Sequence, residues 1–170
     1  MSLLSQFPKL TTGPERLLLE YMLDRNRKAV IDTARGLSEA DARRRLVPSL
    51  TTPIGLVKHA AVAERVWFQR TMLGLAESEC DGRALGGDGS FVVTEGETLD
   101  DVIAEFERAS ARSRAIAAEF ELDDLRSHWI VGEVSLRFVY LLLIEDFARH
   151  AGHGDILREQ ILAALEELQV

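Results

Sequence analysis

The sequence predicts an all-α protein, built as an up-down-down-up four-helix bundle with a short extra helix and a long loop between helices 2 and 3. Four long segments carry apolar residues at the spacing of a helix face, and no segment shows the strict alternation of a half-buried strand. A glycine-rich connection over residues 76–97 is long enough to join helices that are not antiparallel neighbours. We expect the 170 residues to form a single domain spanning 1–170.

The first three helices are predicted from their capping residues and from the glycines that end them. The segment 14–34 repeats apolar residues at helical spacing and is followed by Gly36. The short segment 38–45 begins with a Ser-x-x-Asp sequence, whose serine hydroxyl can accept a hydrogen bond from the first turn. In the segment 52–73 a threonine precedes a proline at the first helical position, and Gly74 ends the helix.

The second half of the chain predicts two more helices after the long connection. Residues 76–97 contain five glycines and six acidic residues, which leaves few apolar side chains for a packed core. The segment 98–120 starts with a Thr-x-x-Asp sequence and carries an inward apolar stripe. An irregular stretch, broken at Gly132, precedes the last helix, which is predicted over about 134–168. Two glycines in it, at 152 and 154, are its weakest points.

The charge balance and the apolar pattern exclude several kinds of partner. The chain has 20 basic and 28 acidic residues, so it lacks the basic surplus that binds a nucleic-acid backbone. Its longest apolar stretch, residues 138–144, is far too short to cross a bilayer. The first ten residues do not resemble a secretory leader, and Cys80 is the single cysteine. We therefore expect a cytoplasmic protein without intrachain disulfides, which acts on a small molecule and binds neither nucleic acid nor membrane.

Histidines and an aspartate interrupt the apolar faces of two predicted helices. Asp146, His150 and His153 stand at i, i+4 and i+7 of the last helix, within an arc of about 60° on an otherwise apolar stripe. His59 lies among apolar neighbours on the second long helix in the same way. Burying these groups without partners would be unfavourable, so the pattern requires that they satisfy one another or share a ligand.

Two interpretations of this pattern remain open from the residues alone. In the first, the side chains hold a divalent metal, zinc or nickel, because imidazole nitrogens and carboxylate oxygens suit both ions. His153 is then a fourth ligand or a hydrogen-bonding neighbour of the ligands. In the second, His59 is a core histidine hydrogen-bonded to Asp146, while His150 and His153 reach solvent. No catalytic or cofactor-binding residue is assigned from the sequence.

Other polar residues are expected to lie outside this site. His128 falls in the irregular stretch and is expected to be a surface histidine. Glu64 and Arg65 lie off the inward face of their helix, so we expect them to be solvated or paired with each other.

Three motifs resemble those of the DinB-like superfamily of four-helix bundles, which includes the mycothiol-dependent maleylpyruvate isomerase fold. They are GLSEADAR at 36–43, GLVKH at 55–59 with ERVWF at 64–68, and IEDFARHAGH at 144–153 with LRE at 157–159. The resemblance covers most of the chain, and the last of these motifs is the most specific.

This resemblance implies a divalent metal held by His59, Asp146 and His150. It also implies a low-molecular-weight thiol such as mycothiol or bacillithiol as a cofactor, whose thiolate the metal stabilises as a Lewis acid. The chain departs from the superfamily pattern at two positions. Asp146 stands where glutamate or histidine is usual, and Leu142 stands where many close relatives have histidine.

Two functions from different classes follow. The first is a divalent-metal-dependent thiol transferase or isomerase that acts on a small molecule. The second is a non-catalytic binding or stress-response protein, in which the His/Asp cluster is vestigial or structural. In either case we expect a homodimer.

Overall fold

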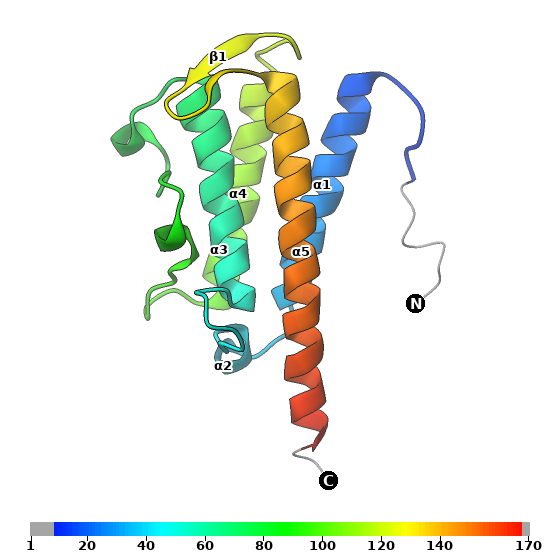
Figure 1. The fold of residues 1–170 in the computed structure, drawn as a ribbon, viewed down its shortest axis with the longest axis vertical. Coiled ribbons are helices and arrows are strands. Elements are labelled where there is room, and N and C mark those ends of the chain that lie inside the picture. Colours follow the sequence, from blue (N-terminus) through cyan, green and yellow to red (C-terminus); the bar gives the residue numbers. More distant parts are fainter. Residues whose placement is uncertain (1–8, 168–170) are drawn as a thin grey trace.

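The computed structural model describes residues 9–167, which are mostly helical with one small two-stranded sheet. The predicted helical class is therefore confirmed. Four long helices lie side by side: α1 (Glu15–Ala34), α3 (Pro53–Glu64), α4 (Leu99–Ala117) and α5 (Leu136–Glu167) (Figure 1). The short helix α2 (Glu39–Ala42) precedes α3 at one end of this group.

Three of the predicted helix starts are formed by the expected caps. The Ser38 hydroxyl accepts a hydrogen bond from the Asp41 backbone N–H at the start of α2. Thr52 caps α3 by accepting from the Gly55 N–H at 3.0 Å. At α4, Thr98 and Asp101 accept hydrogen bonds from each other's backbone N–H groups, which satisfies two donors that a helix start leaves unpaired.

The core is formed where α1 packs on α5 and α3 packs on α4. At its centre Phe106 and Phe147 meet edge to face, with ring centroids 5.6 Å apart and both rings fully buried. The two glycines of α5 do not interrupt it. At Gly154 the helix approaches α1 so closely that a Cβ atom would lie 2.6 Å from side-chain atoms of Thr33.

A first ion-pair chain connects α1 with α4 and α3. Arg114 of α4 and Arg27 of α1 both pair with Asp24, at 2.8 and 2.7 Å. Arg27 also donates two hydrogen bonds to Glu64, at 2.7 and 2.9 Å, and the Glu64 side chain is fully buried. The expectation that Glu64 is solvated or paired with Arg65 is therefore wrong. It fails because α3 is covered by other helices on the side that its own pattern marks as polar.

The helix that begins at α3 continues as a π-helix, η2 (Arg65–Met72), and ends at Gly74 with a φ of 74°. The Thr71 hydroxyl donates to the Val66 carbonyl, five residues earlier, at 2.8 Å. The predicted end of this helix near residue 73 is thus correct. The change to a wider helix rotates the residues of η2 relative to an α-helical continuation.

A β-hairpin replaces the irregular stretch expected before the last helix. Strand β1 (Leu125–His128) pairs antiparallel with β2 (Gly132–Ser135), and His128 faces Gly132. His128 is only 5% exposed and stacks on Trp67 and Trp129, so the expectation of a surface histidine is wrong. The hairpin folds this ring onto η2 instead of leaving it in solvent.

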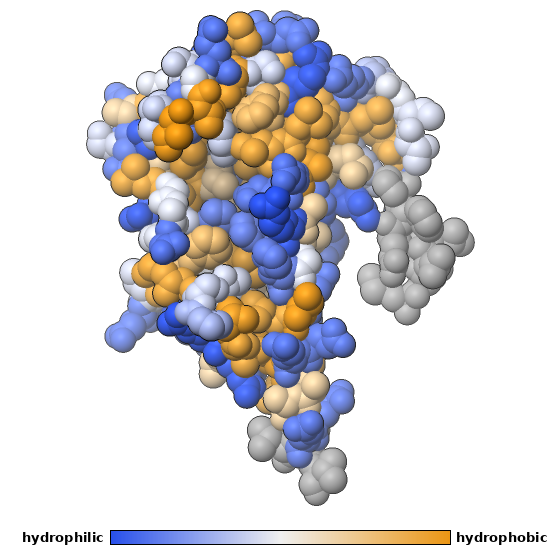
Figure 2. All heavy atoms as spheres, in the orientation of Figure 1, coloured by the Kyte–Doolittle hydropathy of each residue, from blue (hydrophilic) through white to orange (hydrophobic). Residues whose placement is uncertain are grey.

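The long connection between η2 and α4 passes along the outside of α3 (Figure 1). It contains two short 3-10 helices, η3 (Glu77–Glu79) and η4 (Asp88–Phe91), and η4 contacts α3. The outer surface of the molecule carries hydrophobic side chains around the β-hairpin and the start of α5 (Figure 2). None of the helices within residues 9–167 combines the length and the apolar character needed to span a bilayer.

Candidate metal centre

Three of the four predicted ligands converge between α3 and α5. His59 lies on α3, while Asp146 and His150 lie one turn apart on α5. His59 Nε2 is 3.5 Å from Asp146 Oδ2, and His150 Nε2 is 3.2 Å from Asp146 Oδ1. One potential ligand atom from each residue lies within 4.8 Å of the other two. The i, i+4 spacing on α5 therefore presents both side chains to a histidine of the neighbouring helix.

His153 lies at the edge of this cluster. Its ring centroid is 5.8 Å from that of His150, and its side chain is exposed. It lines an open surface pocket together with Val47 and Thr51 from the loop before α3. Within residues 9–167, the group of potential ligands that approach one another to 4.8 Å consists of His59, Asp146 and His150.

Two residues of the long connection, Ser90 and Phe91, fix the ring of His59. Phe91 stacks on it, with ring centroids 4.2 Å apart and ring planes inclined by 4°. The Ser90 hydroxyl lies 2.7 Å from His59 Nδ1 and donates its own hydrogen to the Gly87 carbonyl at 2.6 Å. Because the hydroxyl has one hydrogen, the donor in its contact with His59 is the Nδ1–H of the ring. The hydrogen-bond network therefore assigns the Nδ1-protonated tautomer to His59.

This tautomer leaves a lone pair on His59 Nε2, the atom that faces the Asp146 carboxylate. Two electron-rich atoms in a partly buried site need a positive charge beside them, either a second proton on the ring or a cation. His150 also has an unsatisfied atom, because its buried Nδ1 has no hydrogen-bond partner within residues 9–167. Two imidazoles and one carboxylate are a ligand set that zinc and nickel accept, so the residues fit a divalent cation.

Asp146 supplies the negative charge of the cluster. Burial raises its pKa, but hydrogen bonding, above all with His150, outweighs burial and holds the pKa of Asp146 well below its usual value of 3.8. The carboxyl group is consequently ionised at neutral pH. This is the protonation state that a metal-binding carboxylate requires.

A second ion-pair chain holds the long connection against the helices. Arg65 of η2 pairs with Asp81 and with Glu105 of α4, both at 2.7 Å. Lys58 of α3 pairs with the same Glu105 at 2.6 Å and also with Glu97. Asp81 precedes η4 in the chain and Glu97 follows it, so the connection is tied down on both sides of the segment that contacts His59.

This part of the site was not predicted from the sequence. Ser90 and Phe91 fall in the long connection, to which no role was assigned, and Arg65 was expected to be solvated or paired with Glu64. The Arg65 side chain is instead only 3% exposed, because the connection covers the side of the helix that was expected to face solvent. The one available signal was Phe91, an aromatic residue inside a segment of glycines and acids.

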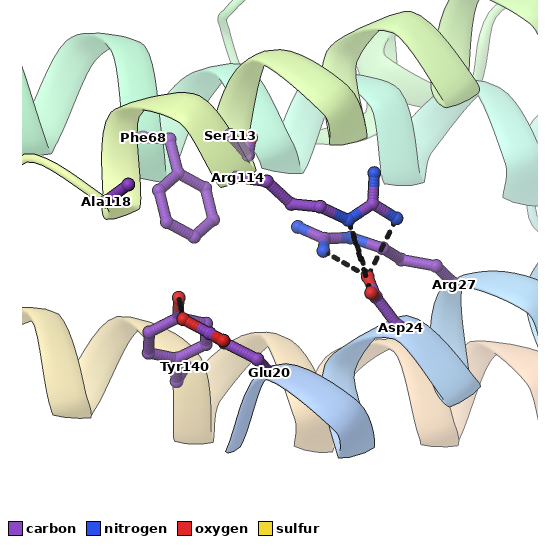
Figure 3. A pocket seen from close by; sticks show the side chains of 8 residues that line it. All are labelled: Glu20, Asp24, Arg27, Phe68, Ser113, Arg114, Ala118 and Tyr140. Atoms are coloured by element: carbon purple, nitrogen blue, oxygen red, sulfur yellow. Dashed lines mark hydrogen bonds and ion pairs between the residues drawn. The ribbon is translucent and has the colours of Figure 1, made fainter. Parts of the chain in front are cut away.

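A separate pocket of about 250 Å³ lies between α1, α4 and α5 (Figure 3). Its charged side chains and the Tyr140 hydroxyl already contact one another. Arg27 and Arg114 both bind Asp24, and the Tyr140 hydroxyl donates to Glu20 at 3.4 Å. Burial, together with the charge of Glu20, raises the pKa of Tyr140 to about 12. None of the residues that line this pocket belongs to the His/Asp cluster, so we assign it no part in the candidate metal centre.

The fold and the cluster together define a helical protein with a candidate His/Asp/His site for a divalent metal. The family model for mycothiol-S-transferase matches residues 18–163. The chain therefore belongs to the mycothiol-S-transferase family, which is DinB-like, and the resemblance inferred from the motifs is confirmed. The matched range includes His59, Asp146 and His150. No curated protein matches the chain.

Proposed function

We propose that the protein is a divalent-metal-dependent transferase that joins a low-molecular-weight thiol of the mycothiol type to a small molecule in the cytoplasm. Family membership supports the thiol and the reaction class. The observation that carries the metal is the His59 tautomer, which places the Nε2 lone pair 3.5 Å from an ionised carboxylate. We propose zinc or nickel at this point, with His59, Asp146 and His150 as the ligands.

Each residue of the cluster has a distinct task in this proposal. Asp146 provides the negative charge that retains a cation, and His59 is held in the ligating tautomer by Ser90. His150 offers a second imidazole one turn after Asp146 on α5. A divalent cation in this position would supply Lewis acidity that favours the thiolate over the thiol at neutral pH.

The thiol itself has to come from outside the chain. Cys80 is the single cysteine, and it lies in the long connection, where its thiol donates to the Ala76 carbonyl at 3.5 Å. Burial raises the pKa of the Cys80 thiol, which lowers its fraction of reactive thiolate. An external thiol therefore supplies the nucleophile. Its sulfur forms the new C–S bond, the leaving group departs with the electron pair of the broken bond, and the thiol proton passes to solvent.

The test is a titration of the cobalt-substituted protein with mycothiol and, separately, with bacillithiol. We expect a sulfur-to-metal charge-transfer band with at least one of these thiols. If neither thiol gives a band at millimolar concentrations, the transferase proposal is overturned. That result would favour the non-catalytic binding protein, in which the cluster has only a structural role.

We also propose that α1, α3, α4 and α5 form an up-down-down-up bundle and that the protein is a homodimer. The long connection between η2 and α4 supports the first proposal, because such a topology needs one crossover between neighbouring parallel helices. Exposed apolar side chains support the second. They lie on the hairpin and the start of α5, at Trp129, Ile130, Val131, Phe138 and Leu141. Sedimentation equilibrium tests the dimer, and a monomer at micromolar concentration would contradict it.

A further inference from the structure

A pocket of about 170 Å³ adjoins the His/Asp cluster on the side of η2. His59 and Asp146 lie at its polar end, and Gly86 of the long connection also borders it. The rest of its wall is apolar and consists of Val62, Ala63, Val66, Trp67 and Leu142. A molecule held in this pocket would therefore place its apolar part against these side chains and its other end beside the cluster.

The aromatic wall of the pocket is part of a stack of rings. Trp67 stacks on His128, with ring centroids 4.6 Å apart, and His128 stacks in turn on Trp129 at 3.9 Å. The Arg70 guanidinium covers the outer face of Trp129 at 3.9 Å. His128 Nδ1 accepts a hydrogen bond from the Ile130 N–H at 3.1 Å, which fixes the middle ring of the stack. The position of Trp67, and with it the width of the pocket, is set by three groups stacked on it in series.

The size and charge of the pocket restrict what it can accept. Apolar cavities of about 150 Å³ bind benzene, so a pocket of 170 Å³ has room for one six-membered ring. Among the described residues that line it, Asp146 is the only acidic one and no lysine or arginine is present. In the metal-free pocket, an anionic group would therefore meet a carboxylate and find no lysine or arginine to pair with.

We propose that this pocket binds the apolar part of the substrate, and that the substrate is a neutral electrophile whose apolar group is no larger than one six-membered ring. This inference rests on the proposed transferase function, because it assigns the second substrate of that reaction. Trp67 and Leu142 are the specificity-determining residues, since they line the pocket from two different helices, η2 and α5.

Ring binding can be measured without metal, thiol or turnover. The Trp129→Phe variant keeps an aromatic ring to stack on His128 and leaves Trp67 as the one tryptophan, so its fluorescence reports on the pocket directly. We expect toluene to change this fluorescence with saturation, both with and without added zinc. In the metal-free protein, benzoate, which is anionic, and naphthalene, which has two rings, should bind at least tenfold more weakly than toluene.

Two substitutions on α5 form a matched pair for this measurement. Leu142→Phe fills the pocket and should weaken toluene binding at least tenfold, whereas Leu141→Phe, at an exposed neighbouring position, should change it less than twofold. Leu142→Ala should enlarge the pocket and admit naphthalene. Equal toluene binding in the two phenylalanine variants, or benzoate binding as tight as toluene binding in the metal-free protein, would overturn the pocket assignment.

The two proposals fail in different ways. A charge-transfer band with thiol but no binding of toluene would overturn the ring pocket and leave the transferase function intact. Toluene binding without such a band would overturn the transferase function, and with it the role of this pocket in holding a substrate.

Discussion

Phe91 lies flat against His59, with the two ring planes inclined by only 4°. The two residues come from different parts of the chain, one from the long connection and the other from α3. Together with the Ser90 hydrogen bond, this stacking leaves the imidazole of His59 one orientation and one tautomer. The connection therefore contributes to the candidate metal centre without supplying a ligand.

Replacement of Ser90 by alanine tests this contribution. Ser90→Ala removes the acceptor of the His59 Nδ1–H, so we expect zinc affinity to fall by about tenfold or more, with helix content unchanged. Competition with a chromophoric chelator measures the affinity. Ser78→Ala, an exposed serine of the same connection, is the matched control and should bind zinc as the unmodified chain does. Equal affinity in the two variants would contradict a role for Ser90 in positioning His59.

Alanine substitutions on α5 distinguish the proposed ligand His150 from the neighbouring His153. His150→Ala should abolish zinc retention after gel filtration, because His150 contributes one of the two imidazoles of the cluster. His153→Ala should retain zinc with at most a few-fold loss of affinity, since this side chain is exposed at the edge of the cluster. Helix α5 should stay intact in both variants, because alanine is a good helix former. Loss of zinc in His153→Ala would make His153 a fourth ligand.

The convergence of His59, Asp146 and His150 could be predicted from the sequence because their positions on the inward helix faces depend on local periodicity. Asp146 and His150 share a helix face through their spacing alone, and His59 is conspicuous as a histidine among apolar neighbours. The helix starts were predictable for a similar reason, since caps such as Thr52 and Thr98 act within a single turn.

The surroundings of the cluster could not be predicted, because they depend on contacts between distant segments. Ser90 and Phe91 belong to a connection without periodicity, whose position is set by ion pairs with Arg65 and Lys58. The hairpin that buries His128 escaped prediction because its strands have only four residues each. In both cases the structure depends on contacts between residues far apart in the sequence, and no local sequence pattern indicates those contacts.

The buried pair of Arg27 and Glu64 should be important for stability. Arg27→Met leaves a fully buried carboxylate without its partner, so we expect the free energy of unfolding to fall by about 3–5 kcal/mol. Arg149→Met removes an exposed pair with Glu145 on α5 and should cost no more than about 0.5 kcal/mol. Urea denaturation followed by circular dichroism measures both values. Similar losses in the two variants would show that burial does not distinguish these pairs.

Acid unfolding should depend on Asp24. Burial raises its pKa, but hydrogen bonds from Arg114 and Arg27 outweigh burial and leave the pKa of Asp24 below its ordinary value of 3.8. A carboxyl group with a lowered pKa in the folded state stabilises the fold above 3.8, and this contribution is lost as the pH falls through the folded-state value.

Asp24→Asn should accordingly be less stable than the unmodified chain at neutral pH, and the difference should shrink as the pH falls below 3.8. Urea midpoints measured from neutral pH to about pH 3 provide the test. Asp155→Asn, at an exposed position of α5, controls for the change in net charge. A stability difference that stays constant over this range would show that the titration of Asp24 is not linked to folding.

The close approach of Gly154 to Thr33 makes position 154 sensitive to substitution. A Cβ at position 154 would collide with Thr33, and α5 is one continuous helix that also carries Asp146 and His150. A side chain at position 154 would push α5 away from α1 and shift Asp146 and His150 relative to His59. A substitution at Gly154 should therefore be as damaging as one in the candidate metal centre, although glycine has no side chain that could bind a metal.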